Sequence, residues 1–552
     1  MVSLRDHFDS RTTALELDRS TWDPHWRDIC RFVEPRRGQW LFMGDQANDG
    51  RKRSNNIIDS TATFAARTLM SGLQSGVTSP SRPWLRLGTE DPYLKEYGPV
   101  KQWLAAVERL MYEAFRRSNL YHVLPRLYLE LGVIGTGAMT VEEHPTRILQ
   151  VSHHTVGSYY LGNGADGTAD TLYRNFKMTA RQMAQRFGKD SLSTTVRNLL
   201  DRNSDSYITV RSVIEPNSDR DPSQADNRNL RIRSVYYEEA GDREQYLEQS
   251  GYYEQPFMAP RWDTSGDDTY GQGPGMIALG DVKQLQDDQL KKAKALALQV
   301  EPPLVVNGME RGELSILPGA VSYSTSTDDK RTVYNAYQQN PDVNWVLEDI
   351  QEVQRRINTA FFVDLFQTIA NMDRSPGAQI TAFEIQERKS EAMLMLGPVL
   401  ERLDNECLDP LVKRTYAILQ RKGMLPPQPP ELDNQALKIE YISILSQAQK
   451  ASSVSVIDNV VANTFQLAQA DPSAMDWLDT DQVVQTRTDL LGGPPEIMRS
   501  QQQVDAMRQR RQQQEQMQQM AANAPALADT AKTMSDTSLD GSNALTRILG
   551  IA

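Results

Sequence analysis

Apolar residues recur every three or four positions through most of residues 1–135, which is the spacing of helices with one buried face. The N-terminal segment MVSLRDHFDSRTTALELDRSTWD is typical of an amphipathic helix. One apolar stripe stops at the prolines of VTSPSRPWLRL, and a second helix is predicted after Pro99.

From about residue 138 to 260 the period shortens toward two, as in half-buried strands. The stretch ILQVSHHTVGSYYLGNGADGTADTLYRNF predicts two strands joined by a turn at Gly162–Gly167. Thr179 and Gln182 predict a capping box for a short helix that ends at Gly188. Because SYITVRSVIEP and LRIRSVYYEEAGDREQYLE resume the strand pattern, we expect an α+β domain with an antiparallel sheet.

Two long helices are predicted on either side of a short β insert. The first, ALGDVKQLQDDQLKKAKALALQVE (278–301), ends at a pair of prolines, and the second, DVNWVLEDIQEVQRRINTAFFVDLF (342–366), has apolar residues along one face. At about 1.5 Å per residue each helix is roughly 35 Å long. Between them, LVVNG and LSILPGAVSYSTS predict short strands.

Residues 367–379 (QTIANMDRSPGAQ) interrupt the second helix. Thr381 and Glu384 then predict a capping box at the start of another long helix. Pro398 and Pro410 predict kinks in it, since each proline removes a backbone donor and its ring clashes one turn back.

Gly423 predicts a left-handed cap at the end of this helix. A proline-rich elbow at 426–430 follows, and further helices are predicted at 433–450 and 452–470. The Gln-rich segment 501–520 begins a low-complexity tail.

The composition excludes some classes of function but does not identify one. The 552 residues hold 60 Lys and Arg against 72 Asp and Glu, a formal charge of −12. This balance argues against a broad basic surface that grips nucleic acid, but it is compatible with a protein past which nucleic acid slides. No stretch approaches the length of a transmembrane helix, the N-terminus lacks the apolar core of a signal peptide, and two distant cysteines favour a reducing compartment.

The motifs that could indicate catalysis or ligand binding are each incomplete. GVIGTGAM (132–139) lacks the Lys-Ser/Thr ending of a phosphate loop, and His153 and His154 point to opposite faces of a predicted strand. The loop DTSGDDTYGQG lacks the spacing of a calcium-binding EF-hand. We therefore predict no catalytic residue, no metal site and no cofactor, and we favour an interaction or conduit role over an enzyme.

Four stretches of sequence together indicate a family. They are Asp59-Ser60 at a helix start, TSPSRPW (78–84), YNAYQQNPDVNWVLEDIQEVQRRI (334–357) and TAFEIQERKSEAMLMLGPVLERLDNECLDPLVKRTYAILQRKGMLP (381–426). The chain resembles the head-to-tail connector, or portal, proteins of short-tailed, T7-like bacteriophages, and the resemblance covers nearly its whole length. It implies a predominantly helical α+β fold that assembles as a dodecameric ring around a central tunnel.

The resemblance also implies a division of the chain into named regions. These are the wing (1–275), the first stem helix (276–301), the clip (302–341), the second stem helix (342–366), the tunnel loop (367–380), the kinked helix returning to the wing (381–430), the crown (431–500) and the Gln-rich tail (501–552).

Candidate site residues follow from these regions. Those facing DNA in the tunnel loop are Asn371, Asp373, Arg374 and Gln379. Those of the stem and tunnel are Glu348, Glu352, Arg355 and Arg356. Acidic rings would repel duplex phosphates and limit sticking, while sparse cations would make weak contacts. Lys330 and Arg331 are the candidates for docking in the clip, and Pro398 is the candidate for a kink that sets how far the tunnel loop reaches.

The implied partners are further copies of the chain, double-stranded DNA in the tunnel, the terminase large subunit, and then a tail adaptor or tube protein. Major capsid and scaffolding proteins, and internal core proteins at the crown, complete the set; no membrane is implied. The implied location is the portal vertex of the virion, with assembly in the host cytoplasm.

Two alternatives stay open. One is a helical scaffold or internal virion protein without a DNA channel, which would explain the helices and the Gln-rich tail. The other is a packaging ATPase or nuclease, which would need a phosphate loop or clustered metal-binding carboxylates.

Overall fold

The computed structural model describes residues 3–42, 50, 54–91, 93–94, 97–221, 223–224, 226–307, 315, 317–324, 333–335, 343–372, 395–432, 437–442, 457–469, 471–490 and 503–518. The chain divides into two compact units. The first comprises residues 1–87, 106–427 and 439–456, and the second comprises residues 88–105, 428–438 and 457–552.

The N-terminal part is helical, as the apolar spacing predicts. Its elements are α1 (Leu4–Ser20), α2 (Asp23–Phe32), η1 (Pro35–Trp40), α3 (Thr61–Gly76), α5 (Gly98–Arg117) and α6 (Leu120–Ile134). The Ser3 hydroxyl caps α1 by accepting from the Asp6 N–H, and Gly135 ends α6 in the left-handed region with φ 92°. A short strand that was not predicted, β1 (Leu85–Thr89), follows the prolines.

The strand-rich region forms two antiparallel sheets where one was expected. One has the order β3-β2-β9, and the other has the order β4-β5-β6-β7-β8. Their strands are β2 (Ala138–His144), β3 (Ile148–His154), β4 (Tyr159–Asn163), β5 (Ala169–Thr179), β6 (Tyr207–Pro216), β7 (Ile232–Glu238), β8 (Glu248–Tyr252) and β9 (Phe257–Met258).

The stretch from 148 to 176 therefore holds three strands and not two. A tight turn at Thr155–Ser158, with Gly157 at φ 88°, separates β3 from β4 and takes the chain from one sheet to the other. The predicted turn between Gly162 and Gly167 is confirmed, and it joins β4 to β5.

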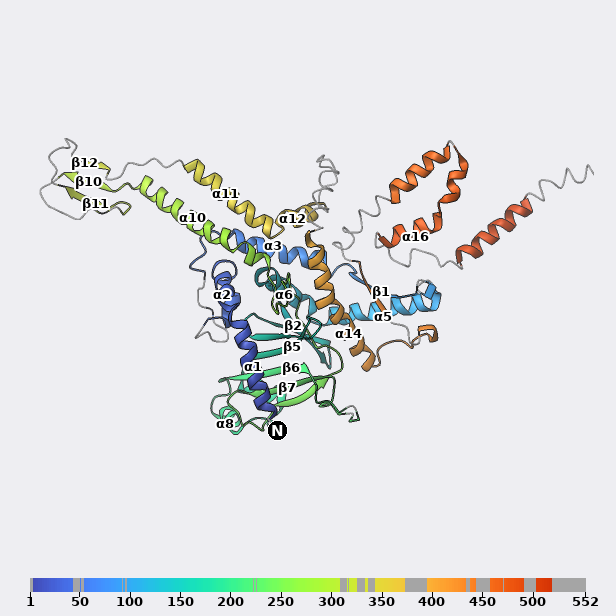
Figure 1. Cartoon of the computed structure of the whole chain (residues 1–552), viewed down its shortest axis with the longest axis horizontal. Coiled ribbons are helices and arrows are strands. Elements are labelled where there is room, and N and C mark those ends of the chain that lie inside the picture. Colours follow the sequence, from blue (N-terminus) through green and yellow to red (C-terminus); the bar gives the residue numbers. More distant parts are fainter. Residues whose placement is uncertain are drawn as a thin grey trace, which may run out of the picture. The chain divides into compact units, whose positions relative to one another are not determined.

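Helices cover both faces of the larger sheet. Side chains of a strand alternate between faces, so Val235 and Tyr237 pack with Phe8 and Leu15 of α1, whereas Tyr236 packs on the opposite face. That opposite face is covered by α7 (Ala180–Phe187) and α8 (Thr194–Arg202). Figure 1 shows α1 lying across the strands. The predicted capping box at the start of α7 is confirmed, with both of its hydrogen bonds present.

A pair of long helices with a small sheet forms the next part of the first unit (Figure 1). It consists of α9 (Pro274–Ile277), α10 (Leu279–Val300), β10 (Leu304–Asn307), β11 (Val321–Ser324), β12 (Val333–Asn335), α11 (Val343–Ala360) and α12 (Val363–Met372). Strand β10 is central in this sheet, parallel to β11 and antiparallel to β12. The expected arrangement of helix, β insert and helix is present.

The prediction of one continuous helix over 342–366 is wrong at its C-terminal end. The chain breaks at Phe361–Phe362, where Phe362 has φ 56°, and α12 then continues to Met372. Phe361, Val363, Leu365 and Phe366 are all buried. A straight helix turns 100° per residue and could not bury these four positions on one side, so the break lets the core accept them. The expected tunnel loop, 367–380, is accordingly helical through Met372.

The returning helix is irregular just before Pro410. Residues 395–403 are helical, a π-helical turn η2 (Asp404–Leu408) follows, and α14 (Asp409–Arg421) completes the helix. A proline ring crowds the carbonyl four residues earlier, and the wider π turn relieves this. Pro398 lies exposed within the helical residues 395–403, and the predicted capping box at Thr381 and Glu384 falls outside the described residues.

The end of α14 has the predicted left-handed cap. Gly423 has φ 63°, and the Met424 N–H donates to the Leu419 carbonyl while the Gly423 N–H donates to Gln420, which is a Schellman motif.

The prediction of a helix at 433–450 is wrong. After η3 (Pro430–Leu432) comes a strand, β13 (Leu437–Tyr441), which pairs with β1. The Ile442 N–H donates to the Trp84 carbonyl, and the Tyr441 hydroxyl donates to Asp409 Oδ1 at 2.6 Å. Residues 437–441 (LKIEY) alternate between apolar and polar side chains, and this period of two is typical of a strand and not of the predicted helix.

The second unit is mainly helical where it is described. Residues 457–469 form a helix, within the predicted 452–470, and η4 (Pro472–Trp477) and α16 (Thr480–Leu490) follow. Residues 503–518 of the Gln-rich segment are also helical, and Arg508 forms an ion pair with Asp481 of α16.

Candidate functional site

The stem candidates lie on α11, and three of them share its outward face. Glu348, Glu352 and Arg355 are spaced by four and three residues and are exposed, whereas Ile350 and Val353 of the same helix are buried. None of the three exposed side chains forms an ion pair with the described part of the chain.

Arg356 differs from these three because it reaches across to α10. Its guanidinium lies 3.5 Å from Asp281 and donates to the side-chain oxygen of Gln284 at 3.5 Å. This contact shows which turns of the two antiparallel helices lie side by side. Of the remaining candidates, Asn371 belongs to the last turn of α12, while Lys330, Arg331, Asp373, Arg374 and Gln379 lie outside the described residues.

The root of the helix pair is held by the carboxylate of Asp59. Its Oδ1 accepts from the N–H and the hydroxyl of Thr61 at the start of α3, at 2.8 and 2.5 Å. Its Oδ2 accepts from the amides of Gln289 on α10 and Gln354 on α11, each at 2.9 Å. One charged side chain thus ties three helices together.

A buried glutamine completes this junction. The Gln286 side-chain oxygen accepts from the N–H groups of Ile58 and Asp59 at 2.7 and 2.9 Å, and its amide donates to the Asp59 carbonyl at 2.9 Å. Gln286 is 5% exposed, so these bonds satisfy a side chain that would be costly to bury alone.

The balance of forces on Asp59 favours its ionised form. Partial burial opposes ionisation, but the hydrogen bonds from Thr61, Gln354 and Gln289 outweigh it and hold the pKa of Asp59 below its ordinary value. The junction is therefore built around a carboxylate.

A second anchor joins the returning helix to the loop that leads into α9 and α10. Glu406, in the π turn, accepts from the Arg261 N–H at 2.9 Å and from its guanidinium at 2.6 Å. The same guanidinium donates to the carbonyls of Gly167 and Asp268. Both charges are nearly buried, and the π turn is what places Glu406 at this position.

A third anchor attaches the end of α14 to the smaller sheet. Arg414, with a side chain 2% exposed, pairs with Glu254 at 2.6 Å, and Arg421 pairs with both Glu254 and Glu143. The Lys422 ammonium donates to the His144 carbonyl. These contacts fix the far end of the returning helix to the body of the first unit.

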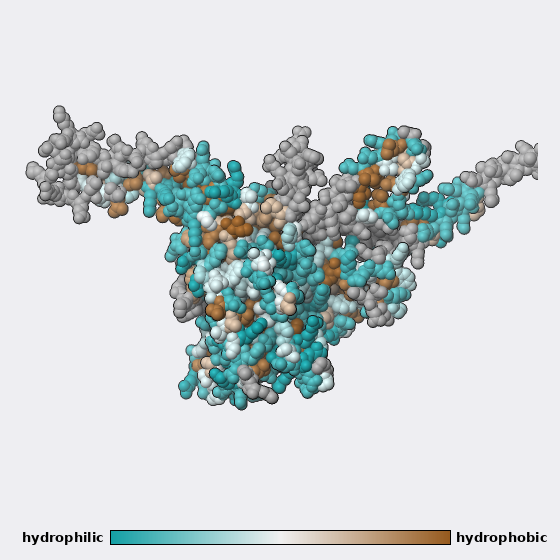
Figure 2. All heavy atoms as spheres, viewed as in Figure 1, coloured by the Kyte–Doolittle hydropathy of each residue, from teal (hydrophilic) through white to brown (hydrophobic). Residues whose placement is uncertain are grey.

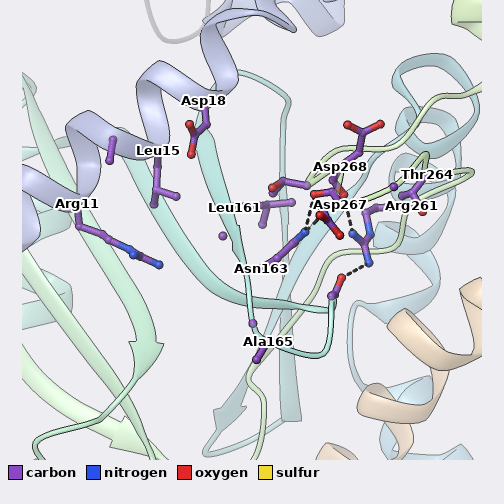
Figure 3. Close-up of a pocket in the computed structure, with 16 residues that line it drawn as sticks. Arg11, Leu15, Asp18, Leu161, Asn163, Ala165, Arg261, Thr264, Asp267 and Asp268 are labelled. Carbon is purple, nitrogen blue, oxygen red and sulfur yellow. Dashed lines mark hydrogen bonds between the residues drawn. The ribbon is translucent and has the colours of Figure 1, made fainter.

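A polar cavity of about 400 Å³ lies between α1, the β4–β5 turn and residues 261–269 (Figure 3). Arg11, Asp18, Asn163 and Asp267 are among its lining residues, and Arg261 lies at its edge with its guanidinium engaged as described above. Within the described residues no group of three or more His, Cys, Asp and Glu side chains is arranged to hold a metal ion. The cavity therefore gives no basis for assigning a catalytic or metal site.

The histidine pair is also explained by packing. His154 is buried and lies 3.1 Å from the Thr140 hydroxyl, and His153 lies 3.2 Å from the buried carboxylate of Glu130 on α6. The two rings have different surroundings, as their positions in a strand predict. Among the described helices none combines the length and the apolar character that a membrane crossing requires.

The described residues thus form a mixed helix and sheet fold, as the resemblance in sequence implies. Residues 5–498 match the family described as bacteriophage head to tail connecting protein, so the chain belongs to this family.

Two relatives make the comparison more specific. The chain is 40% identical over 541 residues to the portal protein of Salmonella phage epsilon15, a match that covers 98% of this chain and 96% of that one. It is 41% identical over 543 residues to the probable portal protein of Bordetella phage BPP-1, covering 98% and 97% of the two chains.

The sequence marks Asp59 only as part of a helix start and does not reveal its partners. The amides of Gln286, Gln289 and Gln354 carry no motif, and Gln354 is far from Asp59 in sequence. One signal was available: Gln286 and Gln289 occupy the inward face of the predicted helix 278–301, where a polar side chain requires a partner.

Proposed function

We propose that this chain is the subunit of a phage portal, a closed dodecameric ring at one capsid vertex. The double-stranded genome would enter through it during packaging and leave through it during ejection. The observation that carries the proposal is the antiparallel pair α10 and α11 with a small sheet at its end. Family membership over residues 5–498 and the printed names of the two relatives support the same role.

In this proposal α10 and α11 are the stem around the channel, and the sheet β10–β12 is the core of the clip. The two-sheet body and the N-terminal helices are the wing, to which the returning helix is anchored. We place the start of the crown after Tyr441 rather than at 431, because β13 pairs with β1.

The clip is the proposed docking surface for the terminase large subunit and later for the tail adaptor or tube protein. The terminase supplies the energy, so this chain is a structural component that hydrolyses no ATP. Charge reversal at Lys330 and Arg331 should weaken both contacts and leave the ring intact. Unchanged binding of both partners would refute this assignment.

The wing and crown are the proposed contacts for major capsid, scaffolding and internal core proteins, with assembly in the host cytoplasm and a final place in the virion. The DNA-facing role of Asn371, Asp373, Arg374 and Gln379 is part of this proposal. Replacing Pro398 by Ala should impair packaging more than ring assembly, since the proposed kink positions the tunnel loop. Failure of ring assembly would instead make Pro398 a folding determinant.

The decisive experiment is the mass and rotational symmetry of the purified chain, measured by light scattering and class-averaged electron micrographs. We expect a closed ring of about twelve subunits with a central hole, because a heterologous contact that closes on itself produces a ring. A monomer at every concentration, or an open filament, would contradict the proposal.

A further inference from the structure

The polar cavity beside α1 has an excess of negative charge (Figure 3). Asp18, Asp267 and Asp268 line it, and none of these carboxylates forms a hydrogen bond or an ion pair with the described part of the chain. Of the two arginines in the lining, Arg261 is already paired as described above, and Arg11 has no counter-charge among the described residues. Three unpaired acids therefore face one unpaired base.

The cavity also contains an acceptor that no donor reaches. The side-chain oxygen of Asn163 is buried and accepts no hydrogen bond within the described residues. The amide nitrogen of the same side chain lies 3.5 Å from the carbonyls of Asp267 and Asp268. Because an acceptor that is buried without a donor costs free energy, a ligand that donates to this oxygen would be stabilised.

A backbone carbonyl adds to the acceptors at this edge of the larger sheet. Strand β4 is an outer strand, and the Leu161 N–H leaves its free edge to donate to the Tyr270 hydroxyl at 3.0 Å. The N–H and C=O of one residue in an antiparallel strand point to the same side, so the Leu161 carbonyl leaves the free edge as well. Leu161 lines the cavity, and no side chain among the described residues donates to its carbonyl.

The two charges of α1 are separated along the cavity. Arg11, Ala14, Leu15 and Asp18 form its α1 side, at the three- and four-residue spacing of one helical face. At about 1.5 Å per residue, Arg11 and Asp18 are about 10 Å apart along the helix axis. Arg11 lies over Gly162, where an added Cβ would be 3.6 Å from Arg11 Nη2. A ligand would therefore meet a donor at one end and acceptors elsewhere.

These acceptors suit a guanidinium group better than a metal ion. In the part of the chain that the structure describes, no three acidic, histidine or cysteine side chains come close enough together to hold a metal. A guanidinium presents five N–H donors in one plane and can reach acceptors that are spread apart, whereas an ammonium has three donors on one atom. The volume of about 400 Å³ lies within the range of ligand sites. Side chains over α1 and the neighbouring strands are mainly hydrophilic in Figure 2, which also favours a polar ligand.

We propose that this cavity is a docking site for an arginine side chain of a partner protein. The guanidinium pairs with Asp18, Asp267 and Asp268 and donates to the side-chain oxygen of Asn163. Arg11 donates to a backbone carbonyl of the segment that carries the arginine. The cavity belongs to the two-sheet body proposed above as the wing, but recognition of a guanidinium does not depend on the ring.

The test compares two small probes on the full-length chain. The first is N-acetyl-arginine amide, and its matched control is N-acetyl-citrulline amide, which has the same shape with a neutral urea group in place of the guanidinium. Saturation-transfer NMR measures the dissociation constant of each probe, because it detects weak ligands of large proteins.

Two variants locate the binding site. Asp18→Asn with Asp267→Asn removes two carboxylates from the cavity and keeps the shape of both side chains. Asp201→Asn with Asp242→Asn makes the same charge change at exposed positions outside the cavity. Circular dichroism establishes that each variant is folded.

The arginine probe should bind the wild type with a dissociation constant in the millimolar range, as a ligand of its size does. The citrulline probe should bind at least tenfold more weakly, because it lacks the charge that the carboxylates attract. The cavity variant should bind the arginine probe at least tenfold more weakly than the wild type, and the control variant should bind it equally well.

Four results would overturn the inference. Absence of binding to the wild type would mean that the cavity accepts no guanidinium. Equal binding of the two probes would mean that charge is not recognised, and unchanged binding by the cavity variant would place the probe elsewhere. Binding to separate subunits but not to assembled rings would mean that a neighbouring copy, and not a partner protein, fills the cavity. The first three results can be obtained whether or not the chain forms rings, so they are distinct from a failure of the proposed function.

Discussion

The Asp59 junction allows a quantitative prediction for the root of the helix pair. Replacing Asp59 by Ala removes an acceptor of four hydrogen bonds, two from Thr61 and one each from Gln289 and Gln354. A hydrogen bond to a charged group contributes about 1.5–3 kcal/mol. Since Asp59 is half-buried and water can replace much of what is lost, we expect a total of about 3 kcal/mol, roughly half of the lowest value of that sum.

The assay is hydrogen exchange of the folded chain, because a global unfolding free energy is poorly defined for a chain with two units. A loss of about 3 kcal/mol lowers the protection of amides at the junction by about a hundredfold. The effect should appear in α3, α10 and α11 together. The control is Asp281→Ala, which removes a more exposed ion pair with Arg356 on the same helices and should lower protection about fivefold or less.

The pH dependence gives an independent check. The folded state lowers the pKa of Asp59, so its contribution is complete above the ordinary aspartate pKa of about 4 and is lost as pH falls below that value. Asp59→Asn should remove this acid-dependent part. Protection in Asp59→Ala within threefold of the wild type, or an equal loss in Asp281→Ala, would refute the reasoning.

Three further predictions test the packing around the site. Burial raises the pKa of Glu108 to about 6 despite the hydrogen bond from the Leu87 N–H. Stability should therefore fall by about 2 kcal/mol as pH rises from 4.5 to 6, and Glu108→Gln should abolish this slope in melting curves. Glu406→Ala leaves Arg261 buried without its counter-charge. It should lower the free energy of unfolding by about 3–5 kcal/mol and expose the returning helix to proteolysis. Gly72→Ala would bring a Cβ to 2.1 Å from a buried ring of α12, and should lower stability by about 1–3 kcal/mol in thermal denaturation.

Each of these has a control or a contrary result. A pH slope that persists in Glu108→Gln would assign it to another group. Unchanged proteolysis of Glu406→Ala would mean that α14 is held by Arg414 and Arg421 alone. Gly280→Ala meets nothing within 4 Å and should stabilise α10 slightly, so equal losses at both glycines would refute the packing argument.

The sequence predicted elements well where one periodicity acted alone. The helices α10 and α11 and the capping box of α7 follow from local rules that no distant contact opposes. Prediction failed where the tertiary structure decides the outcome. The break at Phe362 depends on a core that accepts side chains from all sides of a helix, and β13 forms because β1, far away in the chain, offers it a partner.

The candidate site divides in the same way. The outward position of Glu348 and Glu352 could be predicted from the helical period, because exposure follows from local spacing. The role of Gln354 could not, since its partner Asp59 is brought close only by folding. Nor could the burial of Glu406, whose approach to Arg261 depends on an extra residue in one turn of the helix.

The anchors also limit how the parts of the first unit can move. Asp59 joins α10 and α11 to α3, and Arg261 joins the loop before α9 to the returning helix. A swing of the helix pair relative to the wing would break charge-assisted hydrogen bonds at both places, at a cost of several kcal/mol per subunit. In a ring this cost would be repeated in every copy, so we infer that the helix pair and the two-sheet body move as one body. If the chain forms the proposed ring, any adjustment of its channel would have to come from segments that these anchors do not hold.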